Sequence, residues 1–131
     1  MLRVLALLPL PLLYAFFGFV AWVLRVIGWR RDLVEQGLAR CLPELGVEGR
    51  RRTLHQFYVS LGRLAAEFAH GPRISPRSLE QRMRFENPEL ILEALRANQR
   101  VMLIAAHHCN WEWLLLRCST AFDEPLVAAY K

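Results

Sequence analysis

Cysteine and lysine are both scarce in this chain of 131 residues. The three cysteines form no CxxC pair, and their odd number does not fit the small disulfide framework of a secreted domain. Reduced thiols in a cytosolic setting therefore fit best. Lys131 is the only lysine, so that arginine supplies almost all of the positive charge behind the formal net charge of +5.

Nucleic-acid binding and disorder have little support in the composition. The arginines are nowhere interleaved with aromatic residues, and the densest run, Arg50-Arg51-Arg52, reads as the solvated start of a helix. Hydrophobic residues make up 54% of the chain and charged residues 22%, which excludes a disordered chain. The remaining partners for a basic protein are an anionic membrane surface or an acidic protein.

The amino-terminal segment is a long apolar run. No charge occurs from Val4 to Leu24, a length that at about 1.5 Å per residue is enough to cross a hydrocarbon core of about 30 Å. The run is longer than the apolar part of a signal peptide, and no small-x-small cleavage site follows it. We therefore expect a retained membrane-anchor helix within residues 1–29, regular from about Pro11 to Trp29; a buried helix of a soluble core is the alternative.

Arginines flank this segment unequally. Arg25, Arg30, Arg31 and Arg40 follow the apolar run, whereas only Arg3 precedes it. Arginines and lysines that flank a membrane segment tend to lie on its cytoplasmic side. This tendency predicts that the rest of the chain lies in the cytoplasm.

Residues 30–131 have the pattern of one further domain. We expect a short helix that ends before Pro43, a long helix that ends before Gly71-Pro72, and a third helix that starts at Asn87-Pro88. The apolar face predicted for the long helix consists of Leu54, Phe57, Tyr58, Leu61, Leu64, Ala65 and Phe68.

Continuous apolar runs follow these helices. Val101–Ala106 is typical of a strand buried on both faces, a second such strand is expected at Leu126–Ala129, and Met83–Phe85 alternates as a short strand does. Helices that alternate with buried strands predict an α/β fold.

A polar cluster, His107 to Glu112, stands directly after the first of these strands. Asn110 is positioned to cap a helix that begins at Trp111. In open α/β sheets the carboxyl end of a strand is where ligands usually bind, because loops and helix amino termini converge there.

Three interpretations of the cluster compete. Metal binding by His107, His108, Cys109, Glu112 or Cys118 is weak, because no second His or Cys cluster completes a tetrahedron. A pair of His108 and Glu112 at i, i+4 requires a helix that already begins at His108. A pair of His107 and Glu112 can meet across a strand end, a turn and a first helical turn. In that pair the carboxylate holds the imidazole in one tautomer while the other ring nitrogen takes a proton from a hydroxyl.

At these residues the sequence resembles a known family. Ala106-His107-His108-Cys109-Asn110-Trp111-Glu112-Trp113 is similar to the HxxxxE block, often written AHxGNWE, of the bacterial lipid A biosynthesis acyltransferases. Upstream, Leu42-Pro43-Glu44 and the long helix with Glu67 also resemble the family. This chain has Cys109 in place of the family's glycine, Gly37 in place of asparagine and Leu42 in place of phenylalanine.

The resemblance implies a fold and a place in the cell. The fold is an amino-terminal membrane helix followed by the first helices and strands of an acyltransferase α/β sheet. The sheet is expected to be truncated at Lys131, because family members continue into a second half. The expected location is the bacterial inner membrane, with the catalytic domain in the cytoplasm.

The resemblance also implies an activity in lipid A and lipopolysaccharide biosynthesis. A fatty acyl group passes from acyl carrier protein to a hydroxyl of a lipid A precursor or related lipid. His107 is the expected general base and Glu112 its partner, while Asn110, Trp111 and Glu67 are expected to contact substrate. No metal or cofactor is required. The alternative is a truncated, membrane-associated fragment without activity.

Overall fold

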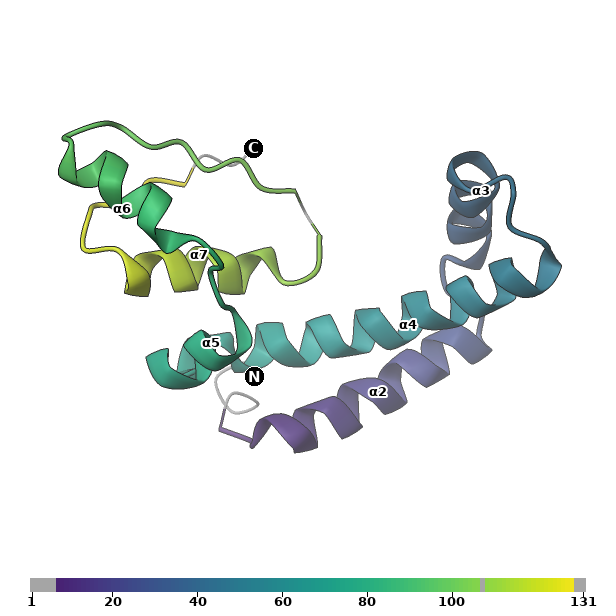
Figure 1. Ribbon diagram of the computed structural model, residues 1–131. Coiled ribbons are helices and arrows are strands. Elements are labelled where there is room, and N and C mark those ends of the chain that lie inside the picture. The colour runs from purple at the N-terminus through teal and green to yellow at the C-terminus, as the bar shows by residue number, and fades with distance from the viewer. Residues whose placement is uncertain (1–6, 107, 129–131) are drawn as a thin grey trace. The chain divides into compact units, whose positions relative to one another are not determined.

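A computed structural model describes residues 7–106 and 108–128, and the regular structure within these ranges is helical (Figure 1). The chain divides into two compact units, Met1–Pro72 and Arg73–Lys131, here called the N-terminal and the C-terminal unit.

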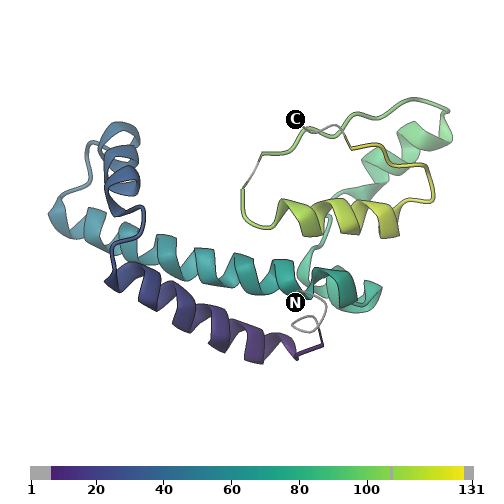
Figure 2. The ribbon, with the colours of Figure 1, turned by 180° about the vertical axis from the view of Figure 1, so that it is seen from behind.

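The N-terminal unit is built on two long helices that lie side by side. Helix α2 (Leu10–Val26) and helix α4 (Val47–His70) run antiparallel, as Figures 1 and 2 show from opposite sides. The shorter α3 (Arg31–Cys41) connects them and also contacts α4. The antiparallel arrangement places the start of α2 beside the end of α4.

Small residues allow α2 and α4 to approach closely. A Cβ atom built on Gly62 would lie 2.8 Å from the carbonyl oxygen of Phe17 and 3.0 Å from the Cβ of Ala21, so this position has no room for a side chain. The buried residues of the pair are Leu10, Leu13 and Ala21 on α2 and Tyr58, Gly62, Ala66 and Ala69 on α4.

The long helix expected before Gly71-Pro72 is confirmed as α4, but its buried face differs from the expected one. Leu64 and Phe68, both placed on the apolar face by sequence, are 39% and 51% exposed. The buried side of α4 combines Tyr58, which was expected there, with Gly62, Ala66 and Ala69, whose small size lets the two helices approach closely.

Helix α2 ends earlier than its apolar sequence indicates. Gly28 has φ +71°, Gly28 N–H donates to Arg25 O, and Trp29 N–H donates to Leu24 O at 2.9 Å. This is a Schellman motif, in which a left-handed glycine closes the helix. It stops α2 at Val26.

The expectation of a membrane-anchor helix that is regular to about Trp29 is therefore wrong, because α2 ends at Val26. At 17 residues, α2 covers about 25 Å at about 1.5 Å per residue, less than the hydrocarbon core of about 30 Å. No single helix in the described ranges is long and apolar enough to span a membrane; α2 and α3 meet those criteria only together, with a bend of 84° between them.

The C-terminal unit contains three shorter helices. They are α5 (Pro76–Arg82), α6 (Pro88–Arg96) and α7 (Trp111–Ala121), and the short 3-10 turn η1 (Gly71–Arg73) precedes them. Ser75 caps α5, with its hydroxyl oxygen accepting from Ser78 N–H at 3.2 Å. The predicted helix start at Asn87-Pro88 is confirmed, with proline in the first turn of α6.

The predicted α/β sheet is wrong for the part of the chain that the structure describes. Residues 101–106 form no strand, and neither do Met83–Phe85 nor residues 126–128; Ala129 lies outside the described residues. A strand exists only through hydrogen bonds to a neighbouring strand, and no neighbour is present here. The apolar side chains of these runs are accordingly open to solvent, with Met102 85%, Ile104 92% and Val127 90% exposed.

Candidate active site

The amino terminus of α7 carries the described part of the polar cluster. The side-chain oxygen of Asn110 accepts a hydrogen bond from Trp113 N–H at 3.0 Å, and Asn110 is 7% exposed. The predicted cap is thus confirmed, and it satisfies one of the amide donors that a helix leaves free in its first turn. Asn110 therefore has a structural role besides the substrate contact expected of it.

The turn before α7 requires a left-handed residue. Cys109 has φ +53°, a conformation that costs a residue with a Cβ atom about 1 kcal/mol and costs glycine almost nothing. The glycine of the AHxGNWE pattern is therefore explained by backbone geometry. Cys109 adopts the same conformation with strain.

Glu112 lies in the first turn of α7 and is half-buried. A carboxylate at this position interacts favourably with the positive end of the helix dipole. The carboxylate oxygens of Glu112 are suited to accept a hydrogen bond from an imidazole N–H. Trp111, the other residue expected to contact substrate here, is 38% exposed in the same turn.

Helix α7 is fixed by contacts within its own unit. Arg117 donates from Nη2 to Glu80 Oε1 at 2.8 Å, and its guanidinium lies 5.5 Å from the ring centroid of Phe85. The ring of Phe85 in turn stacks on Phe122 at 5.5 Å, and Trp113 is 4% exposed. These contacts orient the helix that carries Glu112, and none of them was expected from the sequence.

The structure describes one of the two histidines of the cluster, His108. His108 is exposed, and because α7 begins only at Trp111, the helix that an i, i+4 pair of His108 and Glu112 needs is absent. His107 lies outside the described residues, so its pairing with Glu112 stays a prediction.

Glu67 belongs to the N-terminal unit, on α4. Its Oε1 accepts a hydrogen bond from the Tyr14 hydroxyl at 2.8 Å, which joins the start of α2 to the end of α4. Tyr14 is 53 residues away in sequence, and no local pattern points to it. The structure thus gives Glu67 a role in helix pairing, and its contact with substrate stays a prediction.

Metal ligation has no support among the residues that the structure covers. Within 7–106 and 108–128, no three His, Cys, Asp or Glu side chains come close enough to hold an ion. Cys118, one of the ligands considered, is buried. Burial raises the pKa of its thiol, and the positive charge of the nearby Arg117 opposes this effect.

Comparison with known proteins identifies the family. The sequence model of the bacterial lipid A biosynthesis acyltransferases matches residues 1–119, which includes α2 to most of α7. The chain belongs to this family. No curated protein and no solved structure matches it. Membership makes the chain one of the acyltransferases, which need an acyl donor and a lipid acceptor.

Proposed function

We propose that this protein transfers a fatty acyl group from acyl carrier protein to a hydroxyl of a lipid A precursor or a closely related lipid. The observation that carries the proposal is the position of Glu112, in the first turn of a helix capped by Asn110, five residues after His107 in a block that resembles the HxxxxE motif. The alcohol supplies the nucleophile, so neither a metal nor a protein nucleophile takes part.

In the proposed mechanism His107 is the general base. It removes the proton from the acceptor hydroxyl as the oxygen attacks the thioester carbonyl of the donor. Glu112 holds the imidazole in one tautomer and stabilises its protonated form. A carbon–oxygen bond forms, the carbon–sulfur bond breaks, and His107 returns the proton to the departing sulfur of the carrier.

The positive end of α7 contributes to the same reaction. Charge develops on the carbonyl oxygen in the tetrahedral intermediate, and backbone N–H groups at a helix amino terminus stabilise such an oxyanion. The Asn110 cap supports this role, because it holds the first turn in helical geometry. Acyl carrier protein as the donor is supported by charge complementarity between an acidic carrier and a chain of net charge +5.

Attachment to the inner membrane is part of the proposal. The side of α2 turned away from α4 carries an exposed apolar row, here called the α2 apolar face: Leu12, Phe16, Phe19, Trp22 and Val26. Such a row is suited to lie in the interface of a bilayer, parallel to its surface. Arg25, Arg30 and Arg31, at the end of this face, then lie at the level of the anionic head groups on the cytoplasmic side.

The experiment that tests the catalytic proposal compares two neighbouring histidines. Acyl transfer from radiolabelled acyl carrier protein to a lipid A precursor is measured in membranes that contain the protein, His107→Ala or His108→Ala. We expect His107→Ala to lower the rate by at least about a hundredfold, the effect of a lost general base. His108→Ala is expected to leave it near the starting value, because His108 is exposed outside α7.

Two results would contradict the assignment. Unchanged turnover in His107→Ala would remove His107 from the mechanism. A loss confined to His108→Ala would move the base by one residue.

A further inference from the structure

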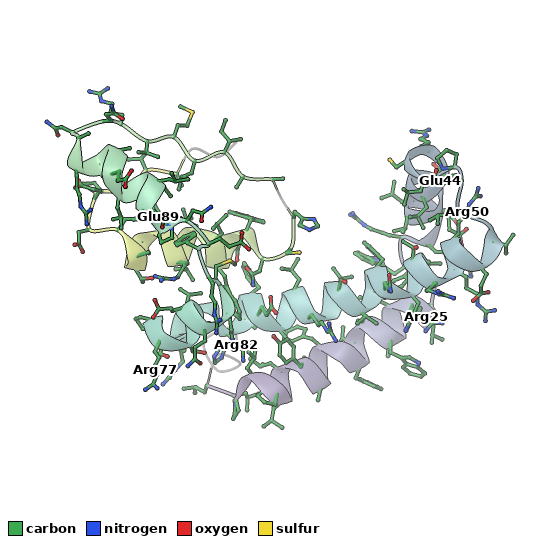
Figure 3. All side chains as sticks on the ribbon, in the orientation of Figure 1. Arg25, Glu44, Arg50, Arg77, Arg82 and Glu89 are labelled. Atoms are coloured by element: carbon green, nitrogen blue, oxygen red, sulfur yellow. The ribbon has the colours of Figure 1, made fainter. Side chains whose placement is uncertain are left out.

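A shallow cavity of about 230 Å³ lies between α2 and α4 in the N-terminal unit. Trp22 and Val59 are among its apolar lining residues, and Arg25, His55 and Arg63 also line it. Arg25 comes from the last turns of α2 and lies beside α4 (Figure 3). The lining of the cavity is thus mainly apolar and includes two arginine residues.

The polar groups at the cavity leave their positive charge uncompensated. Arg25 Nη1 lies 2.8 Å from His55 Nδ1, and because a guanidinium only donates, Nδ1 is the acceptor of this hydrogen bond. His55 therefore orients Arg25 without neutralising it. In the described part of the chain, ion pairs form between Arg31 and Glu35 and between Arg117 and Glu80, so neither Arg25 nor Arg63 is engaged with a carboxylate.

The cavity adjoins the α2 apolar face. Trp22 belongs to both: it lines the cavity, stacks on Phe19 with ring centroids 5.9 Å apart, and is 55% exposed. A molecule that enters from the apolar side thus reaches two arginines at the cavity without leaving apolar contact. A phosphate group with an attached acyl chain is complementary to this site, because it combines a negative charge with an apolar surface.

We propose that this cavity binds one anionic glycerophospholipid, with its phosphodiester at Arg25 and Arg63 and the first part of an acyl chain against Trp22 and Val59. Guanidinium groups donate paired hydrogen bonds to phosphate oxygens, which suits two arginines that form no ion pair with a carboxylate. The proposal rests on the membrane attachment inferred above and adds a defined lipid contact to it. It places the α2–α4 pair at the depth of the lipid phosphates.

The test measures binding of the whole chain to vesicles. One set of vesicles is phosphatidylcholine, and the other contains roughly equal parts of phosphatidylcholine and phosphatidylglycerol. The cavity variant is Arg25→Gln with Arg63→Gln. The matched control is Arg51→Gln with Arg52→Gln, which removes the same two charges from exposed positions on α4 outside the cavity. Helix content by circular dichroism checks that all variants fold.

On phosphatidylglycerol vesicles we expect the cavity variant to bind at least about tenfold more weakly than the control variant, because charge-assisted bonds to phosphate are directional whereas general attraction is shared by both. Replacing Arg25 and Arg63 by lysine should restore only part of the binding, since a lysine keeps the charge and loses the planar fork. Equal binding by the cavity and control variants would overturn the proposed site.

Two further measurements distinguish a lipid phosphate from a free phosphate ester and test membrane attachment independently of the cavity. Glycerol phosphate should bind more weakly than soluble dihexanoyl phosphatidylglycerol; equal binding of the two would overturn the acyl-chain contact at Trp22 and Val59. Absence of binding to either vesicle would instead contradict membrane attachment. Neither outcome depends on acyl transfer, which the His107 experiment tests.

Discussion

Replacing Gly62 by alanine should destabilise the N-terminal unit, although alanine is the better helix former. In the middle of a helix this exchange gains about 1 kcal/mol from propensity alone. At Gly62, however, the new Cβ atom would lie 2.8 Å from the carbonyl oxygen of Phe17 and 3.0 Å from the Cβ of Ala21. Both contacts are with atoms that cannot move unless α2 moves.

Such overpacking costs about 1–3 kcal/mol. The net effect of Gly62→Ala is therefore a loss of about 1 kcal/mol, and Gly62→Val, with two further methyl groups and no comparable gain in propensity, should cost more. Gly37→Ala is the matched control. It lies within α3, and a Cβ atom there meets nothing within 4 Å, so this variant should gain about 0.5–1 kcal/mol.

Thermal unfolding followed by circular dichroism in detergent provides the measurement. The two alanine variants should differ by about 2 kcal/mol, which for a unit of this size corresponds to roughly 8 °C or more in Tm. If Gly62→Ala melted at or above the temperature of the unmodified protein, the close approach of α2 and α4 at this glycine would be refuted.

Three further predictions concern α7 and its neighbourhood. Asn110→Ala removes the cap of α7 and should lower stability by about 1 kcal/mol in thermal unfolding, whereas Asn110→Ser should retain most of it. Cys109→Gly relieves the strain of a left-handed conformation and should raise stability by up to about 1 kcal/mol in thermal unfolding. Cys109→Ala keeps the Cβ atom at φ +53° and should not raise stability. Equal effects of the two substitutions would remove backbone strain as the explanation. Burial raises the pKa of the Cys118 thiol, so a smaller fraction of it is thiolate at a given pH. Iodoacetamide should therefore alkylate Cys118 more slowly than the exposed Cys41, with its rate rising at a more alkaline pH, and the unfolded chain should lose this difference.

Local signals in the sequence were reliable where a single turn of chain decides the structure. The Asn110 cap and the start of α6 at Pro88 depend on a few neighbouring residues, and both were predicted. The end of α2 also has such a signal, since Gly28 follows an apolar helix that ends in a basic turn, although the apolar run itself continues past Val26. The family followed from the residues around His107 and is confirmed over residues 1–119.

The candidate site was predictable as a motif and only in part as geometry. The sequence placed Glu112 in a first helical turn, where the structure finds it. It gave no indication of Arg117, Glu80 and Phe85, which hold α7 in place, because these residues meet only after α5 and α7 pack together.

By itself, the sequence determined where α3 and α4 end, where α6 and α7 begin, which family the chain belongs to, and which residues are candidates for its chemistry. Tertiary structure alone decided which face of α4 is buried, that Tyr14 bonds Glu67, and that Tyr58 donates to Trp29 O at 2.8 Å. It also decided that Val101–Ala106 is no strand, in spite of its composition. The physical reason is the same in each case: caps and turns are stabilised within a few residues, whereas buried faces and strands exist only through partners distant in sequence.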